Sequence, residues 1–363
     1  MLREQIKFIP VKTTGNLVMS KSTAVLQTNT EISFHDRLGG LRVRWDIGRN
    51  DYRVESGLYA CGNPDTASPV LVTANYKLTF DSVRKELFGM DVWILVLDTK
   101  GVNVWCAAGK GTFGTDELLR KIKDTDLARI VTHRDLILPQ LGASGVSAWK
   151  VTEASGFRVH FGPVYARDLS EYLKEGMKKT ETMSRVTFNL GERMAVAPVE
   201  VAHAWKALLL TIPIAVLLSL PTGTGFSSRV FFYLLSLTGG IFAGTILFPA
   251  LLPFLPFRAF SVKGAVLGFL WTALSAFVAF FPAIFSGGAS LPVSPSLPAD
   301  FILLALSGAF LTIPLVSFLS MNFTGASTFT CQTGAELEVK IGLPVMIGMV
   351  AAGIIFGVLK LIM

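Results

Sequence analysis

The chain has 363 residues, of which 51% are hydrophobic and only 16% are charged. This composition excludes an ordinary soluble protein and indicates a membrane protein. The formal net charge of +7 is spread along the whole chain, so it does not form the concentrated basic surface of a nucleic-acid-binding protein.

The apolar residues are concentrated in the second half of the chain. From residue 203 to the end there are six Lys or Arg and three Asp or Glu. We therefore expect a strand-rich N-terminal addition over 1–68, an α/β domain over 69–195 and a transmembrane domain over 196–363. The first 15 residues contain no apolar run of the kind that a signal peptide needs, so we expect the first two parts to stay in the cytoplasm.

Strands and helices alternate through the α/β domain. Before it, the stretches 41–54 and 57–64 predict short strands and turns. Within it, strands are predicted at 69–76, 91–99, 128–133, 135–139, 157–163 and 184–190, and helices at 78–87, 115–124, 144–154 and 166–176. This alternation predicts a parallel sheet covered by helices on both faces. Ligands of such sheets bind beyond the carboxyl ends of the strands.

The segment NVWCAAGKG, residues 103–111, directly follows one of these strand ends. Asn103 is a good helix N-cap, which places Cys106 in the first helical turn, where unpaired amides and the helix dipole favour a thiolate. Gly109 and Lys110 share the face of Cys106, and the small residues around the thiol leave that face open to a broad, flat ligand. The alternative is a buried structural cysteine, the usual place of a free cysteine.

Five apolar segments follow, at 203–220, 229–256, 262–285, 300–321 and 341–362, and most approach or exceed the ~20 residues that span a bilayer. The positive-inside rule places Arg258, Lys263 and Lys340 on the side of the α/β domain. This predicts a multi-pass protein of the cytoplasmic membrane with its α/β domain in the cytoplasm. The only acidic residue within these bounds is Asp300, at the first position of the fourth segment, which favours an anchor over a transporter. The loop 322–340, with Cys331, is expected on the same side.

Residues 69–190 resemble the corrinoid-binding domain of the large subunit of the corrinoid iron–sulfur protein of the acetyl-CoA pathway. The resemblance is carried by VTANYKLTFDS, LVLDTKGVNVWCAAGKGTFGT, LILPQLGASGV and FGPVYARD. The cysteine in NVWCAAGK, the lack of the clustered cysteines that an iron–sulfur cluster needs and the apolar C-terminal half resemble, within this group, the mercury-methylating corrinoid proteins.

This resemblance implies an α/β Rossmann-like corrinoid-binding domain followed by an all-α transmembrane domain of five helices. It implies a cobalamin-type corrinoid whose cobalt takes Cys106 as its lower axial ligand. The implied cofactor contacts are Thr79, Asn103, Val104, Trp105, Cys106, Ala107, Gly109, Lys110, Gln140, Leu141, Gly142, Ala143, Gly162, Pro163 and Val164.

The resemblance also implies an enzyme, a corrinoid-dependent methyltransferase that moves a methyl group from methyl-cobalt(III) to Hg(II). The implied partners are a small ferredoxin with two 4Fe–4S clusters and a methyl donor protein linked to methyltetrahydrofolate. Two alternatives stay open. One is a membrane-bound corrinoid methyl carrier in the one-carbon metabolism of the acetyl-CoA pathway, and the other is a corrinoid uptake or sensing module.

Overall fold

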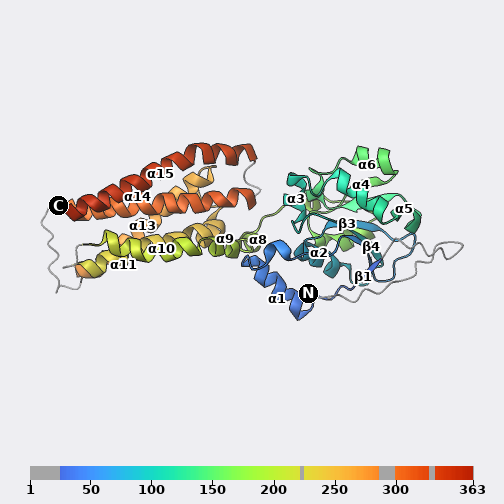
Figure 1. Ribbon diagram of the computed structural model, residues 1–363, viewed down its shortest axis with the longest axis horizontal. Coiled ribbons are helices and arrows are strands. Elements are labelled where there is room, and N and C mark those ends of the chain that lie inside the picture. Colours follow the sequence, from blue (N-terminus) through green and yellow to red (C-terminus); the bar gives the residue numbers. More distant parts are fainter. Residues whose placement is uncertain (1–24, 221–224, 286–298, 327–331, 363) are drawn as a thin grey trace. The chain divides into compact units, whose positions relative to one another are not determined.

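The computed structural model describes residues 25–220, 225–285, 299–326 and 332–362. The chain divides into two compact units, Met1–Val186 and Thr187–Met363. The first is an α/β unit and the second is helical (Figure 1). The loop residues 327–331, which include Cys331, lie outside the described residues, as do the first 24 residues and most of the proline-rich stretch between the third and fourth apolar segments.

The α/β unit contains one six-stranded sheet in the order β1-β2-β4-β3-β5-β6. Its strands are β1 Leu26–Thr28, β2 Gly57–Cys61, β3 Val70–Ala74, β4 Val92–Leu97, β5 Asp135–Leu138 and β6 Arg158–Phe161. All residues of β3 and β4 are buried, as expected for central strands covered on both faces. Strands β4, β3, β5 and β6 are parallel to one another.

Strand β2 runs antiparallel to β4, with Gly57 opposite Val96, so the prediction of a purely parallel sheet is corrected to a mixed sheet. β2 precedes the first strand–helix–strand unit. It therefore adds to the free edge of β4 without a crossover helix that would fix its direction.

Helices cover both faces of the sheet. The helical segments are α1 Phe34–Arg44, η1 Arg49–Asp51, α2 Lys77–Arg84, η2 Lys85–Leu87, α3 Val104–Lys110, α4 Thr115–Asp124, α5 Leu127–Ile130, η3 Gln140–Gly142, α6 Ala148–Ser155, η4 Ala166–Asp168, α7 Leu169–Lys174 and η5 Thr182–Ser184. Ala107, Leu118 and Val151 of α3, α4 and α6 join the core on one face. Phe80 and Tyr172 of α2 and α7 join the core on the other. In Figure 1, α4 and α6 lie on one side of the sheet and α2 on the other.

Three predicted strands are wrong. The β-branched residues of 128–133 favoured a strand, but residues 127–130 form α5. Its Leu127 and Ile130 are buried three residues apart, which is a helical spacing. Part of 41–54 belongs to α1, which a capping box of Ser33 and Asp36 starts upstream. No strand forms over 184–190, where Asn189 instead caps the next helix.

The helical unit contains α8 Leu190–Met194, α9 Ala197–His203, α10 Trp205–Leu218, α11 Phe226–Phe242, the π-helical turn η6 Ala243–Leu247, α12 Phe248–Leu251, α13 Phe260–Phe285, α14 Ala299–Asn322, η7 Phe323–Ala326 and α15 Gln332–Ile362. Within the described residues, four helical stretches are long and apolar enough to cross a membrane, namely Phe226–Leu251, Phe260–Phe280, Phe301–Asn322 and Thr333–Leu359. The predicted first span contains only α10, whose 14 residues are too short for a hydrocarbon core of about 30 Å. A fifth span exists only if α8–α9 and α10, bent by 56°, are counted as one.

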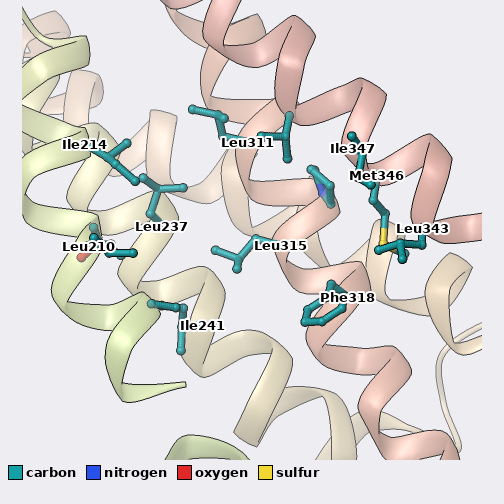
Figure 2. Close-up of a pocket in the computed structure, with 14 residues that line it drawn as sticks. Leu210, Ile214, Leu237, Ile241, Leu311, Leu315, Phe318, Leu343, Met346 and Ile347 are labelled. Atoms are coloured by element: carbon teal, nitrogen blue, oxygen red, sulfur yellow. The ribbon is translucent and has the colours of Figure 1, made fainter. Parts of the chain in front are cut away.

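Small residues let α13 and α14 pack closely. A Cβ added to Gly264 would lie 2.7 Å from the Cα of Ser317, and one added to Gly268 would lie 2.9 Å from the Cα of Ile313. Close backbone approach at small residues is the usual packing of membrane helices. The four helices α10, α11, α14 and α15 also surround a cavity of about 420 Å³. Figure 2 shows its lining of apolar side chains, among them Leu210, Leu315 and Met346.

Candidate functional site at the carboxyl edge of the sheet

The parallel strands place a topological switch point between β3 and β5. From β3 the chain moves to β4 on one side, and it then crosses back to β5 on the other side of β3. The loops that leave β3 and β5 therefore diverge at their carboxyl ends. Ligands of doubly wound sheets bind at such a point. The residues that leave the sheet here are those after Ala74 and those after Leu138.

Asn75, the residue after β3, organises this edge. Its side chain is buried, and its Oδ1 accepts hydrogen bonds from the N–H of Thr99 at 3.1 Å, the hydroxyl of Thr99 at 2.9 Å and the N–H of Gly101 at 3.0 Å. Its Nδ2 donates to Asp98 Oδ1 at 3.0 Å. Lys100 and Gly101 both have left-handed backbone angles, φ 59° and 74°. Asn75 thus holds the tight turn from which α3 starts. Sequence reasoning missed this role, although one polar residue directly after an apolar strand was a signal for it.

Helix α3 begins as predicted. Asn103 Oδ1 accepts a hydrogen bond from the N–H of Cys106 at 2.9 Å, which satisfies one of the unpaired amides of the first turn. Cys106 is a free, exposed cysteine, so the alternative of a buried structural cysteine is wrong for it. That description fits Cys61, which is fully buried on β2 and whose thiol pKa is raised by burial.

The exposed face of α3 is open around Cys106. Trp105, Gly109 and Lys110 are also exposed, and a Cβ built on Gly109 would meet nothing within 4 Å. Val104 and Ala107, two of the predicted cofactor contacts, instead point into the core beneath the helix. The structure therefore brings together Trp105, Cys106, Gly109 and Lys110 and separates Val104 and Ala107 from them.

The predicted contacts after β5 lie beside α3. Gln140, Leu141 and Gly142 form η3, which packs next to α3. A Cβ on Gly142 would lie 2.5 Å from a ring carbon of Phe113, so this glycine allows close packing of the loop that follows α3. Ala143 continues the same turn, its N–H donating to the carbonyl of Gln140 at 3.1 Å.

The predicted contacts after β6 join this loop. Pro163 accepts a hydrogen bond from the N–H of Gln140 at 3.3 Å, and the N–H of Gly162 donates to Leu138 at 2.8 Å. Val164 donates to Met183 at 2.8 Å. Thr79 lies in the first turn of α2, the helix that follows β3, and its N–H donates to Tyr76 at 2.9 Å.

Lys179 also reaches this edge, which sequence reasoning did not foresee. Its ammonium donates to Gln140 Oε1 and to the carbonyl of Phe161, the latter at 2.9 Å. Burial lowers the pKa of this lysine. Across the described parts of the chain, no three His, Cys, Asp or Glu side chains gather closely enough to hold a metal ion.

The fold and this edge define a doubly wound α/β domain with an exposed thiol beside its switch point. The sequence over 44–172 matches the protein family described as CO dehydrogenase/acetyl-CoA synthase delta subunit. Three similar proteins are the gamma subunits of the acetyl-CoA decarbonylase/synthase complex of Methanopyrus kandleri, Methanocaldococcus jannaschii and Archaeoglobus fulgidus. They are 38%, 33% and 30% identical over 136, 142 and 135 residues, which are 37% of this chain in each case and 29%, 29% and 28% of the relatives. The chain thus spans less than a third of the length of these relatives.

These names correct the prediction of a mercury-methylating protein. The family and the relatives are named for acetyl-CoA synthesis, so the predicted methyltransferase acting on Hg(II) is wrong. The prediction of partners is wrong as well, since the relatives are named as subunits of a complex. Those partners were Hg(II), a ferredoxin and a methyltetrahydrofolate-linked donor. All four motifs that carried the resemblance lie within 44–172. They therefore show a similarity over this part of the chain alone, and they say nothing about an acceptor substrate.

Proposed function

We propose that the α/β unit is a corrinoid-binding methyl carrier in one-carbon metabolism of the acetyl-CoA pathway type, held at the cytoplasmic membrane by the helical unit. The observation that carries this proposal is the free, exposed thiol of Cys106 on the open face of α3, inside the part of the chain that matches acetyl-CoA synthase subunits. The helical unit lies outside that match, and its role as an anchor is supported by four long apolar helices.

The residues present fit a corrinoid. A thiolate sulfur is a soft ligand suited to a transition metal, and the open space at Gly109 lets a flat macrocycle approach the helix. Trp105, 38% exposed, offers an apolar ring next to the thiol. When bound, a corrinoid supplies a cobalt ion that accepts and gives up a methyl group.

The chain's own residues would then hold and orient the cofactor. Cys106 would hold the cobalt through its sulfur, and it is kept in place because Asn103 caps its helical turn and Asn75 fixes the turn before it. The loops after β5 and β6, with Gln140 to Ala143 and Gly162 to Val164, would contact the periphery of the cofactor. Trp105, Gly109 and Lys110 would border the ring.

The carrier role follows from exposure. Cys106 and Gly109 lie on an exposed surface, so a corrinoid bound over them would itself be open to partner proteins. We propose that those partners are catalytic subunits of a complex related to acetyl-CoA decarbonylase/synthase. In this account the chemistry of methyl entry and exit belongs to the partners, and this chain presents the cofactor.

Anaerobic reconstitution tests the ligand assignment. The full-length chain in detergent is incubated with cobalamin, and the visible spectrum is compared for the wild type, Cys106→Ala and the control Cys61→Ala. We expect sulfur-ligated cobalt in the wild type and in Cys61→Ala, since Cys61 is buried away from the surface, and its loss in Cys106→Ala. If Cys106→Ala has the spectrum of the wild type, Cys106 is not the cobalt ligand. If the wild type binds no corrinoid, the proposed corrinoid-carrier function is wrong.

A second measurement tests the carrier role. The chain is loaded with an isotopically labelled methyl group and mixed with an acetyl-CoA synthase, CO and coenzyme A. We expect label in acetyl-CoA from the wild type and none from Cys106→Ala. Label that stays on the wild-type chain would contradict a role in acetyl-CoA synthesis while leaving corrinoid binding intact.

A further inference from the structure

The ammonium group of Lys179 is partnered only by neutral oxygens. It donates to the side-chain oxygen of Gln140 and to the carbonyl of Phe161. An ammonium has three N–H donors, so one is left over. In the described ranges, none of the ion pairs includes Lys179. A half-buried cation without an anion is unfavourable, and burial indeed lowers the pKa of this lysine.

The position of Lys179 is at the edge that the cofactor is proposed to occupy. Gln140 starts η3 just after β5, and Phe161 ends β6. These strands are parallel neighbours, with Leu138 opposite Phe161, so Lys179 bridges two adjacent carboxyl ends. Helix α3, which carries Cys106, packs beside η3. The third N–H of the Lys179 ammonium therefore lies at the same edge of the sheet as the helix that carries the Cys106 thiol.

We propose that Lys179 binds the phosphate group in the nucleotide tail of the corrinoid. This assignment rests on the proposed function. The side chains around a corrin ring are largely neutral amides, whereas the tail carries a phosphodiester anion. A cation that lacks an anionic partner therefore selects the tail over the ring. Gln140 keeps the ammonium in position and leaves one donor for the phosphate.

The alternative is a purely structural role, in which Lys179 only links the ends of β5 and β6. The two roles differ in what they predict for ligands without a phosphate. If the role is structural, replacing Lys179 weakens the binding of every corrinoid equally, because it changes the loops that contact all of them. A phosphate contact affects only those corrinoids that carry the phosphate.

The experiment measures dissociation constants of the full-length chain in detergent for three corrinoids: cobalamin, cobinamide phosphate and cobinamide, which lacks both phosphate and base. The variants are Lys179→Met, Lys179→Arg and the control Lys178→Met, which removes the exposed neighbouring lysine. Binding is followed by equilibrium dialysis, so that no turnover is needed.

We expect Lys179→Met to bind cobalamin and cobinamide phosphate roughly 10- to 100-fold more weakly, the factor for one charge-assisted hydrogen bond. Its affinity for cobinamide should match that of the wild type, Lys179→Arg should recover part of the loss, and Lys178→Met should resemble the wild type for all three ligands. An equal loss for cobinamide, or no loss for cobalamin, would overturn this assignment alone. A wild type that binds none of the three would overturn the proposed function and the assignment together.

Discussion

The two units use their buried polar groups for different purposes. In the α/β unit, buried Asn75 binds three groups of the loop that leads into α3. In the helical unit, buried Arg193 donates to the carbonyls of Phe188 at 2.7 Å, Pro249 at 2.6 Å and Ala250 at 3.3 Å, and buried Lys263 donates to Leu252 at 2.8 Å.

The difference reflects what each unit has to hold. Asn75 fixes the turn that leads into α3, the helix with the exposed thiol. Arg193 donates to two carbonyls of α12 and Lys263 to that of Leu252, the residue after it, where the helix ends and no further N–H is available. The cavity of the helical unit has an apolar lining in which Thr211 is the single polar residue. This cavity therefore offers almost no polar group to a ligand, and the buried cations of the helical unit serve its structure.

The largest effect is expected at Asn75. Asn75→Ala leaves the buried N–H of Gly101 without its acceptor, removes the donor to Asp98, and takes one of two acceptors from the N–H and the hydroxyl of Thr99. Together these losses should cost about 3–5 kcal/mol of unfolding free energy in the α/β unit. Hydrogen exchange of the strand amides in the full-length chain measures this loss. Asn63→Ala, at an exposed position, is the matched control. Equal exchange in the two variants would show that Asn75 does not organise the edge.

Arg193→Ala should destabilise the helical unit by about 2–4 kcal/mol, because three carbonyls lose a charged donor. Arg193→Lys, which keeps the charge but not the fork of donors, should lie between this variant and the wild type. The thermal midpoint in detergent is the measurement, with Arg258→Ala at an exposed site as the control. If Arg258→Ala lowers the midpoint as far as Arg193→Ala does, net charge and not helix capping explains the effect.

Two glycines separate packing from ligand access. A Cβ on Gly145 would collide with the carbonyl oxygen of Phe113 and lie 3.0 Å from the Cα of Ala108, so Gly145→Ala should cost about 1–3 kcal/mol. Gly109→Ala meets open space and should leave stability unchanged or slightly raised. By the proposed function it should still weaken cobalamin binding. Unfolding free energies and cobalamin affinities of both variants test the pair, and unimpaired binding by Gly109→Ala would argue against a ring lying on this face.

The smallest effect is expected from pH. Asp36 contacts Lys77 Nζ at 2.7 Å and Arg84 Nη2 at 2.8 Å. Burial alone would raise the pKa of Asp36, but hydrogen bonds from Lys77 and Ser33 outweigh it, and the net pKa lies below its ordinary value. A lowered folded-state pKa gives stability that is present above the unfolded pKa of about 3.9 and is lost as the pH falls below it toward the folded value.

We therefore expect the α/β unit to lose on the order of 1 kcal/mol between about pH 5 and pH 3 through Asp36. Asp36→Asn should remove this part of the pH dependence, and Asp51→Asn, at an exposed position, should not. Unfolding free energies measured across this range decide the matter. A pH slope that Asp36→Asn leaves unaltered would mean that other carboxylates control the acid stability.

Local patterns determined the elements that depend on neighbouring residues. The apolar runs of β3 and β4 predicted two strands, the second of them buried. The sequence also predicted α4 over 115–124, its observed bounds, and Asn103 predicted the start of α3. The apolar segments predicted five membrane-spanning helices, and in the described residues four helices are long and apolar enough to cross a membrane. Each of these depends on propensity, capping or length, which are properties of a short stretch of chain.

Only the tertiary structure decided the direction of the edge strand, the side of α3 that is buried and the long-range side-chain contacts. The antiparallel direction of β2, the inward position of Val104 and Ala107, and the convergence of Lys179 with Gln140 all depend on segments far apart in the sequence. Residues 140 and 179 come together because α6, β6 and α7 lie between them and fold back on one another. Contacts of this kind are set by the packing of whole elements against a common core, which leaves no signature in the residues on either side of one position.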